Sequence, residues 1–290
     1  SFKSAYLKAH YPAEFMAAVI SNGGGYYSTF AYVSEARRMG LQVLGPDIND
    51  STIKYQGKDR TLRVGLMQLQ GFPRDLAETI VRERLKKGLF NSLDDFFRRV
   101  DPEPTAARIL VQSGALDSVS GGLNRPQMLW RFYGEPKDQA VGQSFSLVPL
   151  AIDPSQWPRV EDYDRSTKLS HERETLGFIL SVHPLRIYGR KIASSGRKIV
   201  PANKLSRYMG QRVTLAAWSI TGKEVVTKKG DPMEFVSFED ETAIFETTFF
   251  PKAYQRFCQI LDMNRAYLLT GRVQEQYGTV SLNVEYIQRL

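Results

Sequence analysis

The feature that most constrains the fold is a change of periodicity near residue 205. From there apolar and polar residues alternate, which indicates strands. We expect these strands at 213–218, 235–240, 244–250, 266–273 and 279–287. A helix is expected between the third and fourth strands, at 251–261. Three strands, one helix and two more strands are the order of an OB-fold, a five-stranded β-barrel whose commonest ligands are oligonucleotides and oligosaccharides.

Alternation also predicts which residues of the second strand face solvent. Phe235, Ser237 and Glu239 fall on that face. An exposed ring can stack on an unpaired base, which is worth about 1–3 kcal/mol; the alternative is a contact with a neighbouring domain. The preceding turn adds Lys228 and Lys229. These two lysines and Phe235 are therefore candidate contacts for single-stranded nucleic acid.

A second informative stretch covers residues 64–88, VGLMQLQGFPRDLAETIVRERLKKG. A turn with Gly71 leads into a helix that Gly88 ends. The predicted apolar stripe of this helix consists of Leu76, Ala77, Ile80, Val81 and Leu85. Helix, glycine turn and helix form a helix-hairpin-helix, which aims N–H groups and a positive helix end at a phosphate without reading sequence. The alternative is an ordinary helical hairpin with a glycine corner.

The candidate duplex contacts of this hairpin lie at both ends of its helix. Gly71, Phe72 and Arg74 occupy the turn, and Lys86 and Lys87 the last helical turn. Pro73, which stands where the usual pattern has a second glycine, contributes no N–H.

The remaining pattern suggests four regions. Helical periodicity, split at Tyr11-Pro12, runs through residues 1–40, and helices with glycine corners continue through 41–120. Residues 121–204 combine a linker, a helical segment and a basic connector, and 205–290 form the barrel. The expected fold class is multi-domain α+β, with an α-helical helix-hairpin-helix module followed by the OB-fold.

Charge favours a polyanionic partner. The net charge is +8 and the pI is about 9.4. Residues 205–290 are balanced, with 10 basic and 10 acidic side chains, whereas 185–212 hold eight basic residues and no acidic one. Arg197 and Lys198 in this segment are candidate DNA contacts; a solvated linker is the alternative. A single cysteine, Cys258, and no 18-residue apolar run predict a cytoplasmic protein without a membrane partner.

No catalytic constellation is visible in the sequence. The three histidines lie far apart, and no nucleotide-binding loop or metal-ligand spacing is present. Asp94-Asp95 and Glu239-Asp240-Glu241 are interpreted as solvated turns. We therefore expect a binding protein with no catalytic residue, metal or cofactor of its own.

Several segments resemble one known family. They include SAYLKAHYPAEFMAA, the hairpin, HERETLGFILSVHPL and VVTKKGDPMEFVSFEDETAIFETTFFP. In this order they resemble the C-terminal part of the bacterial DNA polymerase III alpha subunit, a C-family DNA polymerase. The resemblance implies that residues 1–40 end the fingers region, that the hairpin holds primer–template duplex and that the OB domain holds single-stranded template. The parent polymerase would use Mg²⁺ on palm carboxylates that precede Ser1, so this piece should be inactive alone.

The family also tends to carry a sliding-clamp peptide between hairpin and barrel. Gln143, Phe145 and Leu147 occupy the corresponding positions, without the family's Leu-Phe pair. The chain starts without Met and ends at Leu290, so we expect a piece of a longer protein. The sequence leaves open a replicative or an error-prone paralogue.

Two other functions compete with DNA binding in a polymerase. The barrel could be an RNA-binding OB module of a tRNA-charging enzyme, which a preference for tRNA over single-stranded DNA would reveal. The chain could also be a scaffold that docks other replisome subunits through Phe235 and the linker. Unchanged DNA affinity after replacement of Phe235, Lys228 and Lys229 would favour the scaffold.

Overall fold

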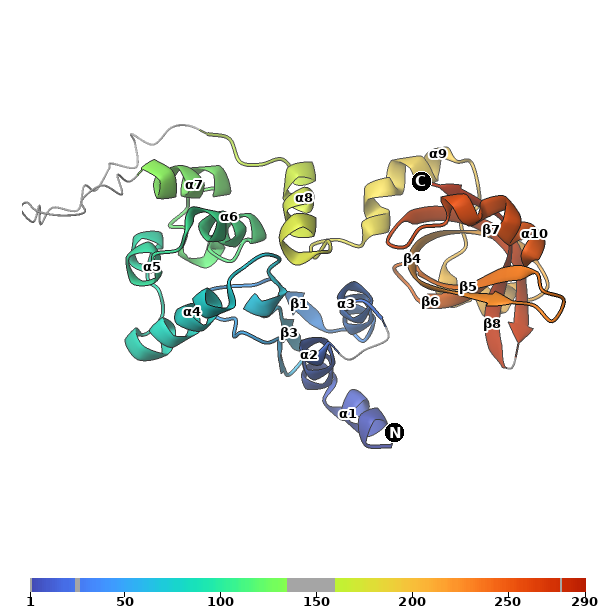
Figure 1. Ribbon diagram of the computed structural model, residues 1–290, viewed down its shortest axis with the longest axis horizontal. Coiled ribbons are helices and arrows are strands. Elements are labelled where there is room, and N and C mark those ends of the chain that lie inside the picture. The colour runs from blue at the N-terminus through green and yellow to red at the C-terminus, as the bar shows by residue number, and fades with distance from the viewer. Residues whose placement is uncertain (1, 24–26, 135–159, 277) are drawn as a thin grey trace, which may run out of the picture. The chain divides into compact units, whose positions relative to one another are not determined.

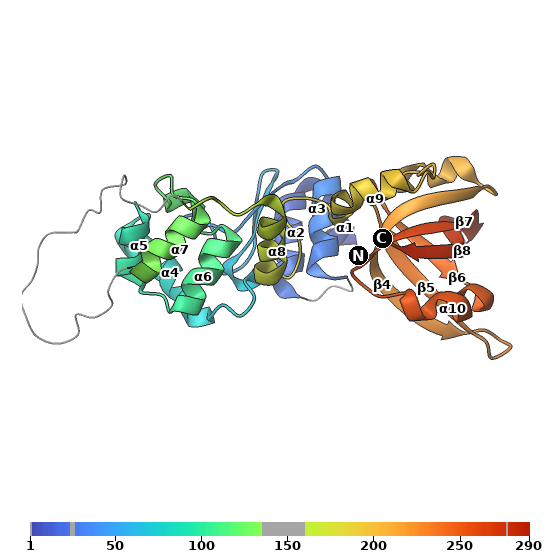
Figure 2. The same ribbon diagram turned by 90° about the horizontal axis from the view of Figure 1, so that it is seen from above.

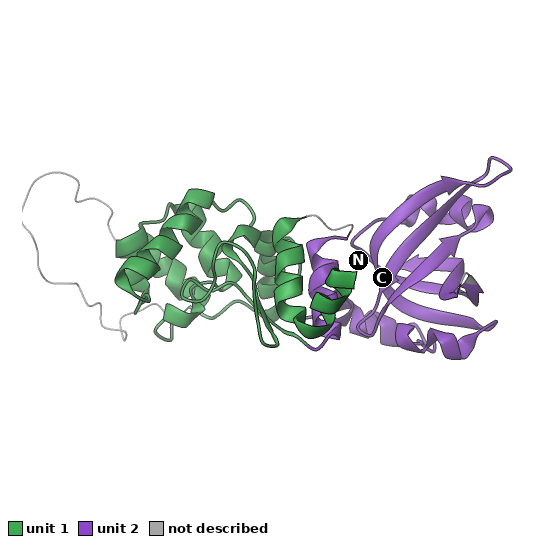
Figure 3. Ribbon diagram, turned by 90° about the horizontal axis from the view of Figure 1, so that it is seen from below, with its two compact units in different colours: residues 1–23, 41–181 green, residues 24–40, 182–290 purple. Residues whose placement is uncertain are grey.

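The computed structural model describes residues 2–23, 27–134, 160–276 and 278–290. The chain forms two compact units, which Figure 3 distinguishes by colour. Unit 1 comprises residues 1–23 and 41–181, and unit 2 comprises residues 24–40 and 182–290. Unit 1 is mainly helical and unit 2 contains a closed barrel, so the predicted α+β class is confirmed. Within the described residues, no helix has the length and apolar character needed to cross a membrane.

Unit 1 is built from short helices around a small sheet (Figure 1). Its helices are α1 (Phe2–His10), α2 (Pro12–Asn22), α4 (Arg74–Lys87), α5 (Leu93–Val100), α6 (Pro104–Ser113), α7 (Arg125–Gly134) and α8 (Arg165–Leu176), with 3₁₀ turns η1 (Leu66–Gln68) and η2 (Asp117–Val119). The break between α1 and α2 confirms the predicted split at Tyr11-Pro12. Ser92 caps α5, since its hydroxyl accepts a hydrogen bond from the Asp95 N–H at 3.1 Å.

Three short strands precede the hairpin in unit 1. They are β1 (Gln42–Leu44), β2 (Gln56–Lys58) and β3 (Thr61–Arg63). β3 lies in the middle, parallel to β1 and antiparallel to β2. Helix α2 packs on β2 and β3. A Cβ at Gly57 would lie 2.1 Å from the Ala13 backbone, so this close approach of helix and strand requires glycine.

Unit 2 contains the predicted barrel. Its elements are β4 (Arg212–Val226), β5 (Pro232–Glu239), β6 (Ile244–Phe249), α10 (Pro251–Phe257), η6 (Cys258–Ile260), β7 (Ala266–Gln276) and β8 (Thr279–Arg289). The strands close in the order β4-β5-β6-β8-β7, with β6 and β8 parallel. Helix α10 packs on β5 and β8 (Figure 2). Phe238, Phe249 and Tyr267 fill the interior. Phe238 is on the face of β5 opposite to Phe235, as the alternation of this strand implies.

The segment that precedes the barrel folds onto it. It contains η4 (Pro184–Tyr188), α9 (Gly189–Ser194) and η5 (Ala202–Tyr208). Val200, Ala202 and Leu205 belong to the barrel core. The Ala202 N–H donates to the Asp240 carboxylate at 2.7 Å. The basic stretch is therefore anchored to the barrel from about Ile199, which forms a bridge with Thr214.

Helix α3 (Thr29–Arg38) also belongs to unit 2 and corrects part of the sequence interpretation. Ser237 is only 7% exposed and Glu239 is fully buried, although both were predicted to face solvent. Glu239 accepts hydrogen bonds from Arg38 Nη1 and Ser34 Oγ of α3, each at 3.0 Å. The interpretation of residues 239–241 as a solvated turn was therefore wrong for Glu239, because a helix some 200 residues earlier in the chain covers it. It was also wrong for Asp240, which is 8% exposed and accepts the Ala202 N–H.

Candidate nucleic-acid interface

The hairpin turn is exposed in unit 1. Gly71 has a φ of +68°, which favours glycine, and no atom lies within 4 Å of the position of its missing Cβ. The Phe72 N–H donates to the Leu69 carbonyl at 3.3 Å, so the turn itself uses this donor. The first helical bond of α4 runs from the Ala77 N–H to the Pro73 carbonyl. The N–H groups of residues 74–76 at the start of α4 are therefore backbone donors that this turn can offer a phosphate, together with the N–H of Gly71.

Arg74 is the exposed cation at this turn. Its side chain is 84% exposed, and its Nε lies 3.1 Å from Glu78. Because an exposed pair of this kind is worth only about 0.3–0.5 kcal/mol, a phosphate can compete for the guanidinium. Asp75 in the same helical turn adds a negative charge that opposes an anion.

Lys86 and Lys87 lie at the opposite end of α4 from the hairpin. A helical rise of about 1.5 Å per residue separates them from Arg74 by roughly 18 Å, so they cannot bind the same phosphate. Lys87 pairs with Glu83 at 2.8 Å. Leu85, predicted to lie on the buried stripe, is 80% exposed, whereas Ala77 and Ile80 are buried. The last turn is held by a polar contact instead, since Arg84 donates to the Ile48 and Ser51 carbonyls at 2.6 and 2.8 Å.

The outer face of the barrel carries a row of side chains defined by strand register. Lys223 of β4 is opposite Phe235 of β5, and Phe235 is opposite Thr248 of β6. Thr248 pairs with Asn283 of β8, which pairs with Arg272 of β7. Residues directly opposite one another share a face of a sheet. We call these five residues the transverse row. Thr248 is only 2% exposed, so the other four members supply the surface that a ligand can reach. β5 and β6 are the second and third barrel strands, whose face binds oligonucleotides in OB-folds.

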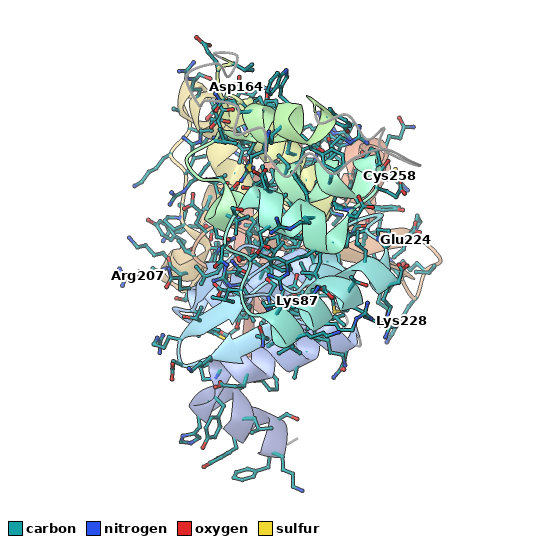
Figure 4. The ribbon with its side chains drawn as sticks, turned by 90° about the vertical axis from the view of Figure 1, so that its left-hand side faces the viewer. Lys87, Asp164, Arg207, Glu224, Lys228 and Cys258 are labelled. Atoms are coloured by element: carbon teal, nitrogen blue, oxygen red, sulfur yellow. The ribbon has the colours of Figure 1, made fainter. Side chains whose placement is uncertain are left out.

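Phe235 is the aromatic member of the transverse row and is 39% exposed. Lys228 and Lys229 lie in the turn between β4 and β5, both exposed. Figure 4 labels Lys228 on this turn. The Thr227 N–H donates to the Asp231 carbonyl at 2.8 Å, which closes the turn. This end of β5 therefore combines one ring with several cations, the composition that single-stranded nucleic acid requires.

Arg197 and Lys198 are exposed at another part of unit 2. The Arg197 guanidinium stacks 5.4 Å above the Tyr286 ring. Both residues precede the bridge to Thr214 near the start of β4, whereas the two lysines of the turn follow its end. The structure thus does not bring the two predicted basic pairs together.

Some predicted residues cannot be located, and others were missed. Gln143, Phe145 and Leu147 lie outside the described residues. Lys223 was not predicted because the sequence interpretation ended the first strand near Trp218, whereas β4 continues to Val226. Alternation extended from the core residues Val213, Leu215 and Ala217 would have placed Lys223 on the inner face. The register shift between Ser219 and Thr221 brings it to the outer face, opposite Phe235, and the sequence pattern does not show this shift.

The arrangement of titratable side chains in the described residues differs from the donor sets that hold metal ions. No group of three or more His, Cys, Asp or Glu side chains there could hold a metal ion. Burial lowers the pKa of His171, whose ring nitrogen lies 3.2 Å from the Gln112 amide. Because these residues do not fit a metal site, no metal-dependent step can be assigned to them.

Comparisons with known proteins agree with this geometry. Residues 40–128 match the family model described as a helix-hairpin-helix motif, and residues 213–290 match an OB-fold nucleic acid binding domain. The DNA polymerase III subunit alpha of Saccharopolyspora erythraea is 33% identical over 97% of this chain and 25% of its own length. The subunits of Escherichia coli K12 and Xylella fastidiosa Temecula1 are 29% and 30% identical over 94% and 100% of this chain, and over 25% and 28% of their own lengths.

A helix-hairpin-helix region followed by an OB-fold barrel defines a nucleic-acid-binding protein. The relatives narrow this class, since similarity to one kind of subunit extends over nearly the whole chain. Nearly the whole chain is similar to DNA polymerase III alpha subunits, as its sequence segments predicted. It spans about a quarter of the length of the curated relatives that it matches.

Proposed function

We propose that this chain is the DNA-binding C-terminal portion of a replicative or error-prone DNA polymerase III alpha subunit. The hairpin of unit 1 holds primer–template duplex through Gly71, Arg74 and the first N–H groups of α4. The barrel of unit 2 holds single-stranded template on the transverse row and on Lys228 and Lys229. The proposal includes a cytoplasmic location.

The observation that carries the proposal is the exposed end of β5. Phe235 remains 39% exposed on the strand face that OB-folds use for oligonucleotides. Lys223 lies directly opposite it. The ring can stack on a base, and the neighbouring cations attract phosphates. Neither contact reads the base identity, so the surface suits single strands of any sequence. The hairpin in the same chain supplies a second, duplex-directed contact.

Further partners follow from the family and are part of the same proposal. Residues 1–40 would end the fingers region, and Gln143, Phe145 and Leu147 would contact a sliding clamp among other replisome subunits. Arg197 and Lys198 would add phosphate contacts beside the barrel. The whole polymerase would use Mg²⁺ to extend a primer.

Binding of a labelled primer–template junction, measured by fluorescence anisotropy over a salt series, tests the proposal. We expect salt-dependent binding by the wild-type chain and weaker duplex binding by the variant Gly71→Val/Arg74→Ala. Valine strains the positive φ of Gly71, and alanine removes the exposed cation. Single-stranded binding should persist, because the substitutions leave the barrel unchanged.

Three outcomes would contradict the proposal. Undiminished duplex binding by the double variant would make the hairpin purely structural. A preference for tRNA over single-stranded DNA would favour the tRNA-charging alternative. Nucleotide incorporation by this chain with Mg²⁺ would show that it is itself a polymerase.

A further inference from the structure

An open pocket lies at the corner between α4 and α5 in unit 1, away from the hairpin. It has a volume of about 440 Å³ and is lined by Lys87, Asn91, Asp95, Arg98 and Arg99. Figure 4 labels Lys87 at the end of α4. Three of these five residues are cationic and one is anionic. The pocket therefore favours an anion. Of its lining residues, only Lys87 is among the duplex contacts predicted from the sequence.

Arg99 forms the fixed wall of the pocket. Its side chain is 8% exposed. Its Nη2 donates to the Glu83 and Gly88 carbonyls at 2.7 and 2.9 Å, and its guanidinium lies 4.2 Å from the Phe90 ring centroid. These neutral carbonyls hold the guanidinium in place. Arg99 is also paired with Asp95 at 3.1 Å and with Glu83 at 3.8 Å, and Glu83 pairs with Lys87 at 2.8 Å. The three cations of the pocket thus face two carboxylates, which leaves one net positive charge.

Asp95 neutralises only part of the positive charge. Its carboxylate accepts hydrogen bonds from Arg98 and Arg99, both at 3.1 Å, and from the Asn91 N–H at 3.2 Å. One carboxylate is thus shared by two guanidinium groups. Arg98 and Lys87 are 77% and 53% exposed, and each keeps further donors that can turn toward a ligand.

We propose that this corner pocket is a second phosphate site, which binds a phosphodiester of the DNA duplex through Arg98, Lys87 and Asn91. The inference rests on the proposed duplex binding. Helix α4 has 14 residues, so it separates the pocket from the hairpin by about 20 Å. The two sites therefore contact different phosphates, and each adds its own counterion release to the affinity.

The salt dependence of duplex affinity tests the pocket directly. Lys87→Ala/Arg98→Ala should reduce the slope of log K against log salt by about 1, and equally for two unrelated duplex sequences. The control Arg82→Ala/Arg108→Ala removes the same charge from exposed positions of unit 1 that do not line the pocket. It should leave the slope unchanged. Both variants should keep the wild-type unfolding temperature, because all four side chains are exposed.

The outcomes separate this inference from the proposed function. A wild-type chain that does not bind duplex overturns both. If the wild-type chain binds duplex but Lys87→Ala/Arg98→Ala leaves the salt slope unchanged, the pocket alone is overturned. The same holds if the two double variants reduce the slope equally. Inorganic phosphate is the second probe. Perturbation of the Arg98 Nε–H resonance by phosphate, without any change in the duplex slope, would identify a site for free anions and overturn the assignment to DNA.

Discussion

The two ends of strand β5 share one outer face but have different surroundings. At one end Glu239 is fully buried under α3, where Arg38 and Ser34 bind its carboxylate. At the other end Phe235 is 39% exposed beside Lys223. Alternation assigns all residues of this face to the outside of the barrel. The comparison teaches that a strand pattern identifies a face, whereas only tertiary packing decides whether that face is open.

The partners of Glu239 at the covered end explain why this carboxylate can be buried. A buried charge is costly unless it is paired and hydrogen-bonded. Glu239 has one cation and one hydroxyl as direct partners, and the His183 ring nitrogen lies 3.4 Å away. Phe30 of α3 packs edge-on against Trp218 beside it, with ring centroids 6.2 Å apart. The covered end is thus a structural contact between α3 and the barrel, and the open end is available to a ligand.

Among the changes considered, removal of the buried Glu239 carboxylate should change the free energy most. Glu239→Ala leaves Arg38 with a largely buried, less compensated charge, which costs about 3–5 kcal/mol of unfolding free energy. Urea unfolding measures this loss. The matched control is Glu241→Ala, two residues along the chain, which removes an exposed pair with Arg186 and should cost less than about 1 kcal/mol. Equal losses in the two variants would contradict the distinction between covered and exposed carboxylates.

Sequence periodicity predicted the barrel well because its information is local. The order of five strands and one helix, and the alternation along β5, both depend on residues close together in the chain. The α3 contact could not be predicted in this way, since Ser34 and Glu239 are 205 residues apart and neither position has a local signal.

The candidate sites show the same limit. Phe235 was predicted to be exposed, and it is. The α4–α5 pocket was not predicted, because it forms only where the end of one helix meets Arg98 and Arg99 of the next. Leu85 was predicted to be buried because periodicity does not reveal where the packing on a helix stops.

At the open end, Phe235→Ala should weaken binding of single-stranded DNA by about 1–3 kcal/mol for each base that stacks on the ring. Stability should change little, because the ring is partly exposed and absent from the barrel core. Anisotropy with a labelled oligonucleotide measures the affinity. The conservative variant Phe235→Tyr keeps a stacking surface and should retain most of it. An unchanged affinity in Phe235→Ala would show that the open end is not the DNA surface.

Replacement of Glu234, which lies on the face of β5 opposite to Phe235, should change stability by the smallest amount. Burial raises its pKa above the usual value of 4.5, and the negative charge of Glu224 raises it further. The folded chain therefore holds this proton more tightly than the unfolded chain. The stabilisation from protonation is present below about pH 4.5 and is lost as the pH rises through the raised pKa.

Glu234→Gln should therefore unfold at a higher temperature than wild type at neutral pH, and the difference should shrink toward pH 4. Glu224→Gln should recover only part of this gain, since it removes the smaller cause and leaves burial in place. Thermal unfolding across a pH series measures both. Parallel profiles for wild type and Glu234→Gln would mean that the carboxyl is as well solvated in the fold as in the unfolded chain. The open end of β5 would then be exposed on both of its faces, in sharper contrast with the Glu239 end.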